Sequence, residues 1–450
     1  MRMRPILLAT APLALAPLAM PPLANAQPRG PLELSMKRAV EIATSVEGNT
    51  NLQLSDEALK QAQDRSGEAR AALLPDFEGA FSYRDLTSNL SAYGIKIAVP
   101  IPGFQFPTFV GPYAVMDARL SGSQNVFDFS SIRRFQASKV GVTAARSDRG
   151  ATEEQVAGRV ARAYLAAIRA QTDLETAEAN VALSEATEKQ AQNQKAAGTG
   201  TGIEITRARV QLANDRQRLL VARNDRRRAH LELLRAMNMR LDMELSLTDK
   251  LAYAPVDPVT MEQAKAQALH ERPDYKAQQE REDNARLSAS ATRMERLPSV
   301  SAFGDYGPNG SGITNAVATR TYGISLHIPI FDGGRRDARR AESDSQYRAE
   351  KIRTNDLKEQ IELDVRVALD SLASAEDEVR VANEGLDLAQ NELTQARRRY
   401  DAGVAIGLEV TDAQTRLERA RENLTAALYN HNLARIDLFQ AMGTVRRAIQ

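Results

Sequence analysis

The chain has 450 residues, with 59 lysines and arginines against 58 aspartates and glutamates, and it contains no cysteine and no tryptophan. The formal net charge is +1, and it would be about −1 without Arg2 and Arg4, which belong to an N-terminal segment discussed next. A nearly neutral chain has no strong positive electrostatic field that would favour binding to nucleic acid. Without cysteine, disulfides, thiolate metal sites and lipid attachment through a thiol are excluded. Alanine, leucine, arginine, glutamate and glutamine dominate, which is typical of long helices and coiled coils.

Residues 1–26 have the pattern of a secretory signal peptide. Arg2 and Arg4 form a basic start, residues 6–23 are mostly apolar, and Ala24-Asn25-Ala26 is a small-x-small cleavage site. The alternative is a transmembrane helix, but four prolines interrupt the apolar run: Pro12, Pro17, Pro21 and Pro22. No uncharged run of about 18 residues follows. We therefore predict no transmembrane helix after the signal, so that any membrane crossing is made by strands.

The chain repeats itself over about two hundred residues. Residues 197–206 match residues 402–411, and residues 126–128 (VFD) match residues 330–332 (IFD). Leu74-Pro75 matches Leu297-Pro298 at a larger shift, so the first copy holds an insertion between these landmarks. Such a long repeat indicates a duplicated domain rather than a solenoid. The expected division is a signal peptide at 1–26, a first repeat at 27–240 (tip about 197–206), an irregular equatorial link at 241–258 and a second repeat at 259–450 (tip about 401–411).

Each copy contains a long coiled-coil pattern. Twelve apolar residues from Ile361 to Tyr400 alternate at steps of four and three, and most of their equivalents from Val156 to Lys195 are apolar too. Glycines at 198–202 and 403–407 end these helices, so each copy should be an antiparallel helical hairpin. A helix from Ser130 to Lys195 would span roughly 100 Å, too long for a compact domain. Shorter helices are expected at about 205–239 and 261–296.

Alternating segments between the helices predict strands. After Pro75 one face has Phe77, Gly79, Phe81 and Tyr83, and before Phe331 one face has Tyr322, Ile324, Leu326, Ile328 and Ile330. Such alternation over about ten residues is typical of barrel strands with a lipid-facing side and a wet lumen. The alternative is an amphipathic hairpin on a soluble core. Two hairpins cannot close a barrel, so closure needs several copies. The insertion is expected to be a stiff loop at the outer rim, with Pro100, Pro102, Phe104, Phe106, Pro107, Phe109 and Pro112.

In this combination the chain resembles the TolC-type outer-membrane efflux family, in its unlipidated branch. The resemblance rests on Leu74-Pro75, Leu297-Pro298, Tyr400-Asp401-Ala402-Gly403, and residues 34–39, 259–264 and 328–334. It implies a mainly α fold with β: a homotrimer whose protomers each give four strands to a shared transmembrane β-barrel and their coiled-coil helices to a periplasmic tunnel. The implied function is a passive outer-membrane exit duct for small molecules or polypeptides in a tripartite efflux or type I secretion system. Its tips would meet a periplasmic adaptor attached to an inner-membrane pump of the RND or ABC type.

Candidate functional residues cluster at the tips. The resemblance implies that Glu409 and Asp412 point into a closed periplasmic aperture, where acidic rings would favour cations; acidic residues also suit a helix N-terminus by themselves. Glu204 holds the matching place in the first copy, and Tyr400 resembles the tyrosine of the family's closing link. The arginine usually paired with that tyrosine is replaced by Ala405. The tip residues expected to meet the adaptor, whose glycines are also ordinary turn formers, are Gly198, Gly200, Gly202, Thr206, Gly403, Gly407 and Thr411.

No catalytic arrangement emerges from the sequence. The four histidines do not cluster: His431 is expected on the coiled-coil seam, His327 in the barrel lumen, and His230 and His270 on the surface. The methionines at 237–261 favour packing of the link over export of a soft metal. We predict no enzyme activity, no cofactor, no metal site and no nucleic-acid partner. Two alternatives are a periplasmic adaptor, which would have one hairpin flanked by β-rich domains, and a purely structural coiled coil, which would not need the alternating strands.

Overall fold

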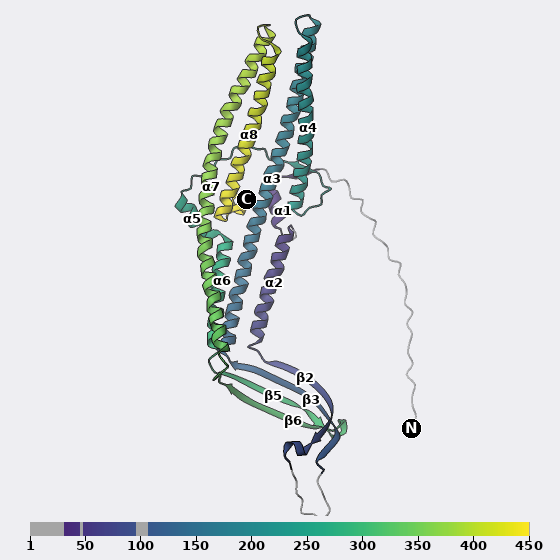
Figure 1. Ribbon diagram of the computed structural model, residues 1–450, viewed down its shortest axis with the longest axis vertical. Helices are drawn as coiled ribbons and strands as arrows, with labels where there is room; N and C mark the ends of the chain where they lie inside the picture. The colour runs from purple at the N-terminus through teal and green to yellow at the C-terminus, as the bar shows by residue number, and fades with distance from the viewer. Residues whose placement is uncertain (1–30, 46–47, 96–106, 450) are drawn as a thin grey trace, which may run out of the picture.

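The computed structural model describes residues 31–45, 48–95 and 107–449, which form a rod of helices standing on a curved sheet (Figure 1). The first half of the chain contains α1 (Met36–Thr44), α2 (Thr50–Ala71), β2 (Asp76–Asn89), β3 (Phe109–Phe127), α3 (Phe129–Ala196) and α4 (Gly202–Ala236). The second half follows the same plan with α5 (Met261–Glu271), α6 (Pro273–Met294), β5 (Ser299–Gly310), β6 (Val317–His327), α7 (Arg335–Asp401), α8 (Gly407–Met442) and α9 (Val445–Ile449). The expected signal peptide, Pro100, Pro102, Phe104 and Phe106 lie outside the described residues.

The two long helices confirm the prediction made from the coiled-coil seam. Helix α3 has 68 residues and α7 has 67, so each extends roughly 100 Å. Asp128 starts α3 by accepting the Ser130 backbone N–H at 3.0 Å. Of the twelve seam residues predicted in α7, ten are buried, and Ala382 and Leu386 are half-buried. The glycines after both helices, Gly198 and Gly403, have φ of 78° and 72°, a left-handed conformation that ends each helix without strain on a Cβ atom.

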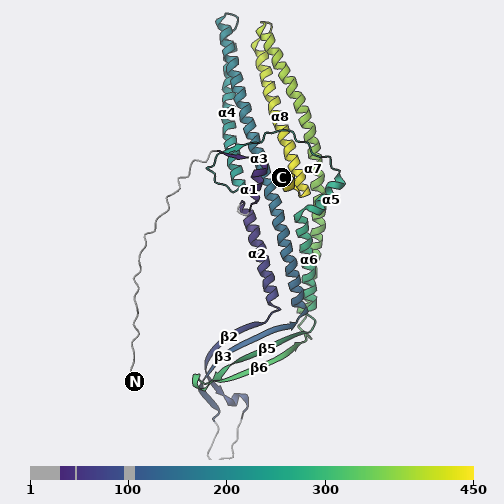
Figure 2. The same cartoon turned by 180° about the vertical axis from the view of Figure 1, so that it is seen from behind.

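The helices form a curved wall that is one helix thick. In the tip half, α3 packs against α4 on one side and α8 on the other, and α8 packs against α7. In the strand half, the neighbours along the wall are α2, α3, α6 and α7 (Figures 1 and 2). The outermost helices of the tip half are therefore α4 and α7. Among the described residues, no helix is both long and apolar enough to cross a membrane.

The sheet has the strand order β2-β3-β5-β6, and each neighbouring pair is antiparallel. Its predicted outward residues are strongly exposed: Phe81 by 69%, Tyr322 by 79% and Ile324 by 78%. The expected loop is shorter than predicted, because Phe109 and Pro112 belong to β3, which has 19 residues. Pro112 has no N–H to donate, and the β2–β3 pairing shifts register beside it, between Leu86 and Ser88.

Two further expectations are corrected by the structure. The helix expected at 261–296 is divided into α5 and α6, because Pro273 starts a new helix and Arg272 before it is extended, with φ −60° and ψ 119°. The link at 241–258 is not wholly irregular. It contains β4 (Leu245–Leu247), which pairs in parallel with β1 (Leu32–Leu34) and so fixes the link to the beginning of the described chain.

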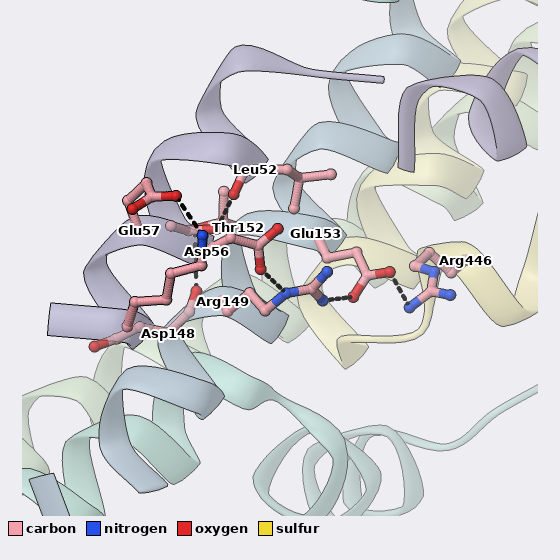
Figure 3. Close-up of polar contacts among 10 residues, drawn as sticks. Leu52, Asp56, Glu57, Asp148, Arg149, Thr152, Glu153 and Arg446 are labelled. Carbon is pink, nitrogen blue, oxygen red and sulfur yellow. Dashed lines mark hydrogen bonds and ion pairs between the residues drawn. The ribbon is translucent and has the colours of Figure 1, made fainter. Parts of the chain in front are cut away.

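An ion-pair chain ties three helices together near the middle of the rod (Figure 3). Arg149 of α3 donates from Nε to Asp56 of α2 at 2.5 Å and from Nη1 to Glu153 at 3.1 Å. Glu153 in turn pairs with Arg446 of α9 at 2.7 Å. The pairing with Asp56 raises the pKa of Arg149. The network therefore joins the end of the chain to the first described helices at the level where α4 and α8 stop.

Candidate functional site

The two hairpin tips contact one another within one chain. Gln190 of α3 donates to the Asp401 carboxylate at 2.7 Å, and Gln414 of α8 donates to the Thr187 hydroxyl at 2.7 Å. The structure thereby brings Glu204, from the first tip, beside Tyr400 and Gly407 from the second. Residues that lie two hundred positions apart in the sequence form one site.

Glu204 hydrogen-bonds to the N-termini of two helices. Its Oε2 accepts the backbone N–H of Thr201 at 2.8 Å, which completes a capping box on α4. Its carboxylate also accepts the backbone N–H of Gly407, at the start of α8. Helix α8 has Ile406 at its N-cap, with no side-chain oxygen to offer, so Glu204 supplies the cap from the other hairpin. The hydrogen bond from Thr201, followed by that from Gly407, lowers the pKa of Glu204.

Tyr400 is the last buried seam residue of α7 and lies next to this carboxylate. Burial raises the pKa of the Tyr400 hydroxyl, and the charges of Glu204 and Asp401 raise it further. A Cβ atom added to Gly407 would lie 3.5 Å from the Tyr400 hydroxyl and 3.5 Å from Glu204 Oε1. The cluster of Glu204, Tyr400 and Gly407, which we call the tip clasp, contains no arginine, in keeping with Ala405.

The two predicted aperture carboxylates are in different environments. Glu409 is half-buried and pairs with Arg399 of α7 at 3.3 Å, whereas Asp412 is exposed and has no ion pair within the described residues. Both follow the start of α8, where the helix dipole favours negative charge. Sequence reasoning missed Arg399, although the arginine run at 397–399 before the turn was a visible signal.

The predicted adaptor-docking residues have four different places at the tips. Gly198 and Gly403 make the turns with positive φ, while Gly202 and Gly407 are the first residues of α4 and α8. Thr206 and Thr411 donate their hydroxyls to the carbonyls of Gly202 and Gly407, at 3.2 and 3.1 Å. A Cβ atom on Gly200 would lie 3.0 Å from the Cβ of Gln194 and 3.0 Å from the backbone N of Lys195, so a side chain here would press on the end of α3.

A buried polar cluster, absent from the sequence predictions, joins the hairpins further from the tips. Asp215 of α4 and Glu418 of α8 are 1% and 2% exposed. Arg218 pairs with Glu418 at 2.7 Å, and the Ser184 hydroxyl donates to Asp215. Burial, followed by the charge of Asp215, raises the pKa of Glu418. A cavity of about 640 Å³ lies beside the cluster between α3, α4 and α8, lined by Asp173, Asp225 and Glu422 among others.

The histidines form no centre. His431 is fully buried as expected, and His270 and His327 are exposed. His230 is half-buried rather than on the surface, and it lines a cavity together with residues 241–251 of the link. Burial lowers the pKa of His230. Within the described ranges, no group of three or more histidine, aspartate or glutamate side chains is placed to hold a metal ion.

Paired hairpins of this length, standing on a sheet with outward apolar side chains, define a channel-forming membrane subunit. The model of the family called outer membrane efflux protein matches residues 42–239 and 265–444. The chain belongs to this family, whose members are outer-membrane channels and not enzymes. It is an outer-membrane efflux channel with a periplasmic helical tunnel, and not a periplasmic adaptor.

Relatives of known name support the assignment. The chain is 24% identical to the alkaline protease secretion protein AprF of Pseudomonas aeruginosa, over 80% of this chain and 75% of that protein. It is 23% identical to the outer membrane protein TolC of Vibrio cholerae, over 74% and 77% of the two chains. The fold is similar to the Campylobacter jejuni CmeC outer membrane channel, with a TM-score of 0.77 at 18% identity, over 91% and 85% of the two chains.

Proposed function

We propose that three copies of this chain form a passive exit duct that carries solutes from a periplasmic adaptor and an inner-membrane pump to the exterior. The observation that supports the trimer is the four-stranded sheet, whose outer strands β2 and β6 have no second neighbour among the described strands. Unpaired backbone groups are costly in lipid, so each edge needs a partner. Pairing β6 of one copy with β2 of the next would close a ring of about twelve strands with three copies.

The proposed route passes along the helices to the tips. The tip glycines, with Thr206 and Thr411, form the proposed docking surface for the adaptor, and Glu409 and Asp412 the proposed lining of the aperture. The tip clasp would hold the two hairpins of each copy together in the closed state. The proposal keeps the expected division into a signal peptide, two repeats and a link, and it includes no enzyme activity and no nucleic-acid partner.

The cargo class follows from the relatives only in broad terms. AprF is named for protease secretion, and OpmQ of Pseudomonas putida is named for pyoverdine export. A polypeptide and a small molecule are therefore both represented among similar proteins. We propose that this chain carries one of these two classes, with a pump of the RND or ABC type behind the adaptor.

Membrane fractionation and conductance measurements test this proposal. The expected result is a heat-modifiable trimer in the outer-membrane fraction that conducts ions as single channels in a planar bilayer. A protein found only in the periplasmic fraction, or a purified trimer with no conductance under any applied voltage, would contradict it. Pull-down of a periplasmic adaptor by the intact protein, with loss of capture on Gly198→Arg and Gly403→Arg, tests the docking surface.

A further inference from the structure

The outward face of the sheet carries an arginine among residues without charge. Residues directly opposite one another on neighbouring antiparallel strands point to the same face, so this face can be followed from strand to strand. Arg320 of β6 lies opposite Tyr306 of β5, and Tyr306 lies opposite Leu120 of β3. The other outward side chains of β6 are Ala318, Tyr322, Ile324 and Leu326. Arg320 therefore belongs to the side of the sheet that faces lipid.

The charges on the other face of the sheet are paired, whereas Arg320 is not. On the lumen side, Arg119 pairs with Asp117 at 3.1 Å and with Asp305 at 2.7 Å. Arg320 is exposed and has no ion pair or hydrogen bond within the described ranges of the chain. A cation on the lipid face is costly at the middle of the apolar band and tolerated near its edge. A counter-charge for Arg320 would have to come from outside this chain.

Arg320 lies near the outer end of the lipid-facing band. It is three residues from Val317, where β6 begins, and seven residues from His327, where β6 ends beside the helices. These separations are roughly 10 and 23 Å along the strand. Toward the helices the exposed apolar side chains continue to Ile328 and Ile330. The guanidinium is thus at the level where the headgroups of the outer leaflet lie, rather than those of the inner leaflet.

A hollow of about 620 Å³ adjoins Arg320 on the same face. Gly122 and Gly304 lie opposite one another and form its floor, while Phe77 and Tyr322, their partners on the outer strands, form its sides. A Cβ atom on Gly304 would come no closer than 3.6 Å to any residue other than its chain neighbours. A side chain would therefore fit there, and the hollow exists because none is present. Its sides are aromatic and exposed, which suits a hydrocarbon chain.

We propose that Arg320 and this hollow bind a phosphate-bearing lipid of the outer leaflet, which in a Gram-negative outer membrane is the phosphorylated glucosamine lipid, lipid A. The guanidinium would donate two parallel N–H groups to one phosphate, and an acyl chain would lie between Phe77 and Tyr322. The inference rests on the proposed ring of strands and adds a ligand to its lipid-facing side.

The order of the two features along β6 selects the leaflet. The cation is at the outer end, and the hollow extends from it toward the helices, as the phosphate and acyl chain of an outer-leaflet lipid would. A lipid of the inner leaflet would place its phosphate at the opposite end of the strand. The outward residues there, Leu326, Ile328 and Ile330, carry no charge.

Native mass spectrometry of the purified trimer with added diphosphoryl lipid A tests the site. The natural protein should retain up to three lipids, and Arg320→Gln should retain them about tenfold more weakly, because a charge-assisted contact is lost. Arg84→Gln is the matched control: Arg84 also has no ion pair among the described residues, but it is two residues from Ser82, which lies opposite Asp117 on the lumen side. Equal retention by the natural protein and Arg320→Gln would overturn the proposal.

Gly304→Val tests the hollow separately from the charge. Valine suits a strand and would fill the space, so retention of lipid A should fall severalfold while the trimer dissociates in detergent at the same temperature or a higher one. The control is Gly79→Val, because Gly79 is on the same face, does not line the hollow, and has no atom within 4 Å of an added Cβ. Unchanged retention in Gly304→Val would overturn the acyl-chain site.

Further arms separate lipid A from other partners of Arg320. Excess inorganic phosphate should not displace lipid A, and displacement would reduce the site to a simple phosphate site. Stronger retention of phosphatidylglycerol than of lipid A would place the ligand in the inner leaflet and overturn the proposal. If Arg320 instead paired with Asp85 of the next copy, Arg320→Gln and Asp85→Asn would weaken the trimer equally and leave lipid retention unchanged. A protein that forms no trimer would reject the proposed function, whereas a trimer that retains no lipid A would reject only this site.

Discussion

His431 has an unusual environment for a polar residue. It lies fully buried on the seam of α8, with its ring 4.6 Å from that of Tyr253 in the link, and neither ring nitrogen has a hydrogen-bond partner among the described residues. Burial lowers the pKa of His431; the charge of Glu376 on α7 opposes this shift and that of Arg435 on α8 adds to it. The folded protein therefore favours the neutral ring.

The lowered pKa of His431 determines how protein stability should change with pH. As the pH falls below about 6.5, the unfolded chain binds a proton that the folded chain resists, so this residue's contribution to stability is lost. We expect His431→Leu to raise the thermal denaturation midpoint, by the equivalent of about 1 kcal/mol at pH 7, and to reduce its decrease between pH 7 and pH 5. Circular dichroism melting at both pH values measures this, with the exposed His270→Leu as control. A lower midpoint for His431→Leu at both pH values would show that the ring packs better than leucine.

At the scale of elements, the ion-pair chain of Figure 3 links α2 and α9 to α3. Arg149→Ala would leave the carboxylates of Asp56 and Glu153 without their shared partner, both of them only partly exposed. We expect a loss of about 1–2 kcal/mol and faster hydrogen exchange in α2, which contains Asp56, because a partly buried charge is left unpaired. The control is Arg146→Ala, one turn earlier and exposed, which has no ion pair within the described residues. Equal exchange in both variants would mean that apolar packing alone holds α2.

Elements with regular spacing were predictable from the sequence, and contacts between elements were not. The seam of α7 could be predicted because apolar residues repeated every 3.5 positions are the pattern of a coiled-coil helix. Pro273 was a local sign of a helix boundary, but the expected helix at 261–296 was drawn through it. Strand β4 pairs with residues more than two hundred positions earlier, and its three residues have no pattern of their own. The hydrogen bond from Gly407 to Glu204 joins the two hairpins, so it could not be predicted from either hairpin alone. In the sequence, Ala405 showed only that the arginine usually paired with the tyrosine at Tyr400 is absent.

At the scale of the whole molecule, the tip clasp couples the two hairpins of each proposed duct subunit. Glu204→Ala removes the acceptor for the α8 N-terminus, and Ile406 cannot replace it. We expect the two tips to separate more often, so that single-channel conductance at neutral pH rises and closed intervals shorten. Because the pKa of Glu204 is lowered, the clasp of the natural protein should persist until the pH falls below the usual value for a glutamate. Thr206→Ala is the control, because the Thr206 hydroxyl donates to the Gly202 carbonyl of its own helix rather than to the other hairpin.

The proposed aperture gives a sharper prediction than an acidic ring in general, because its two carboxylates differ. Arg399 offsets the charge of Glu409, while Asp412 faces solvent and has no cationic partner in the part of the chain that the structure describes. In a trimer, three unpaired Asp412 carboxylates would dominate the local potential at the constriction and favour cations. We therefore expect Asp412→Asn to lower the cation-to-anion permeability ratio more than Glu409→Gln does, and Arg399→Gln to raise it by exposing the charge of Glu409. Reversal potentials in a salt gradient measure all three variants. An equal ratio in the natural protein and in Asp412→Asn would place the selective region elsewhere along the duct.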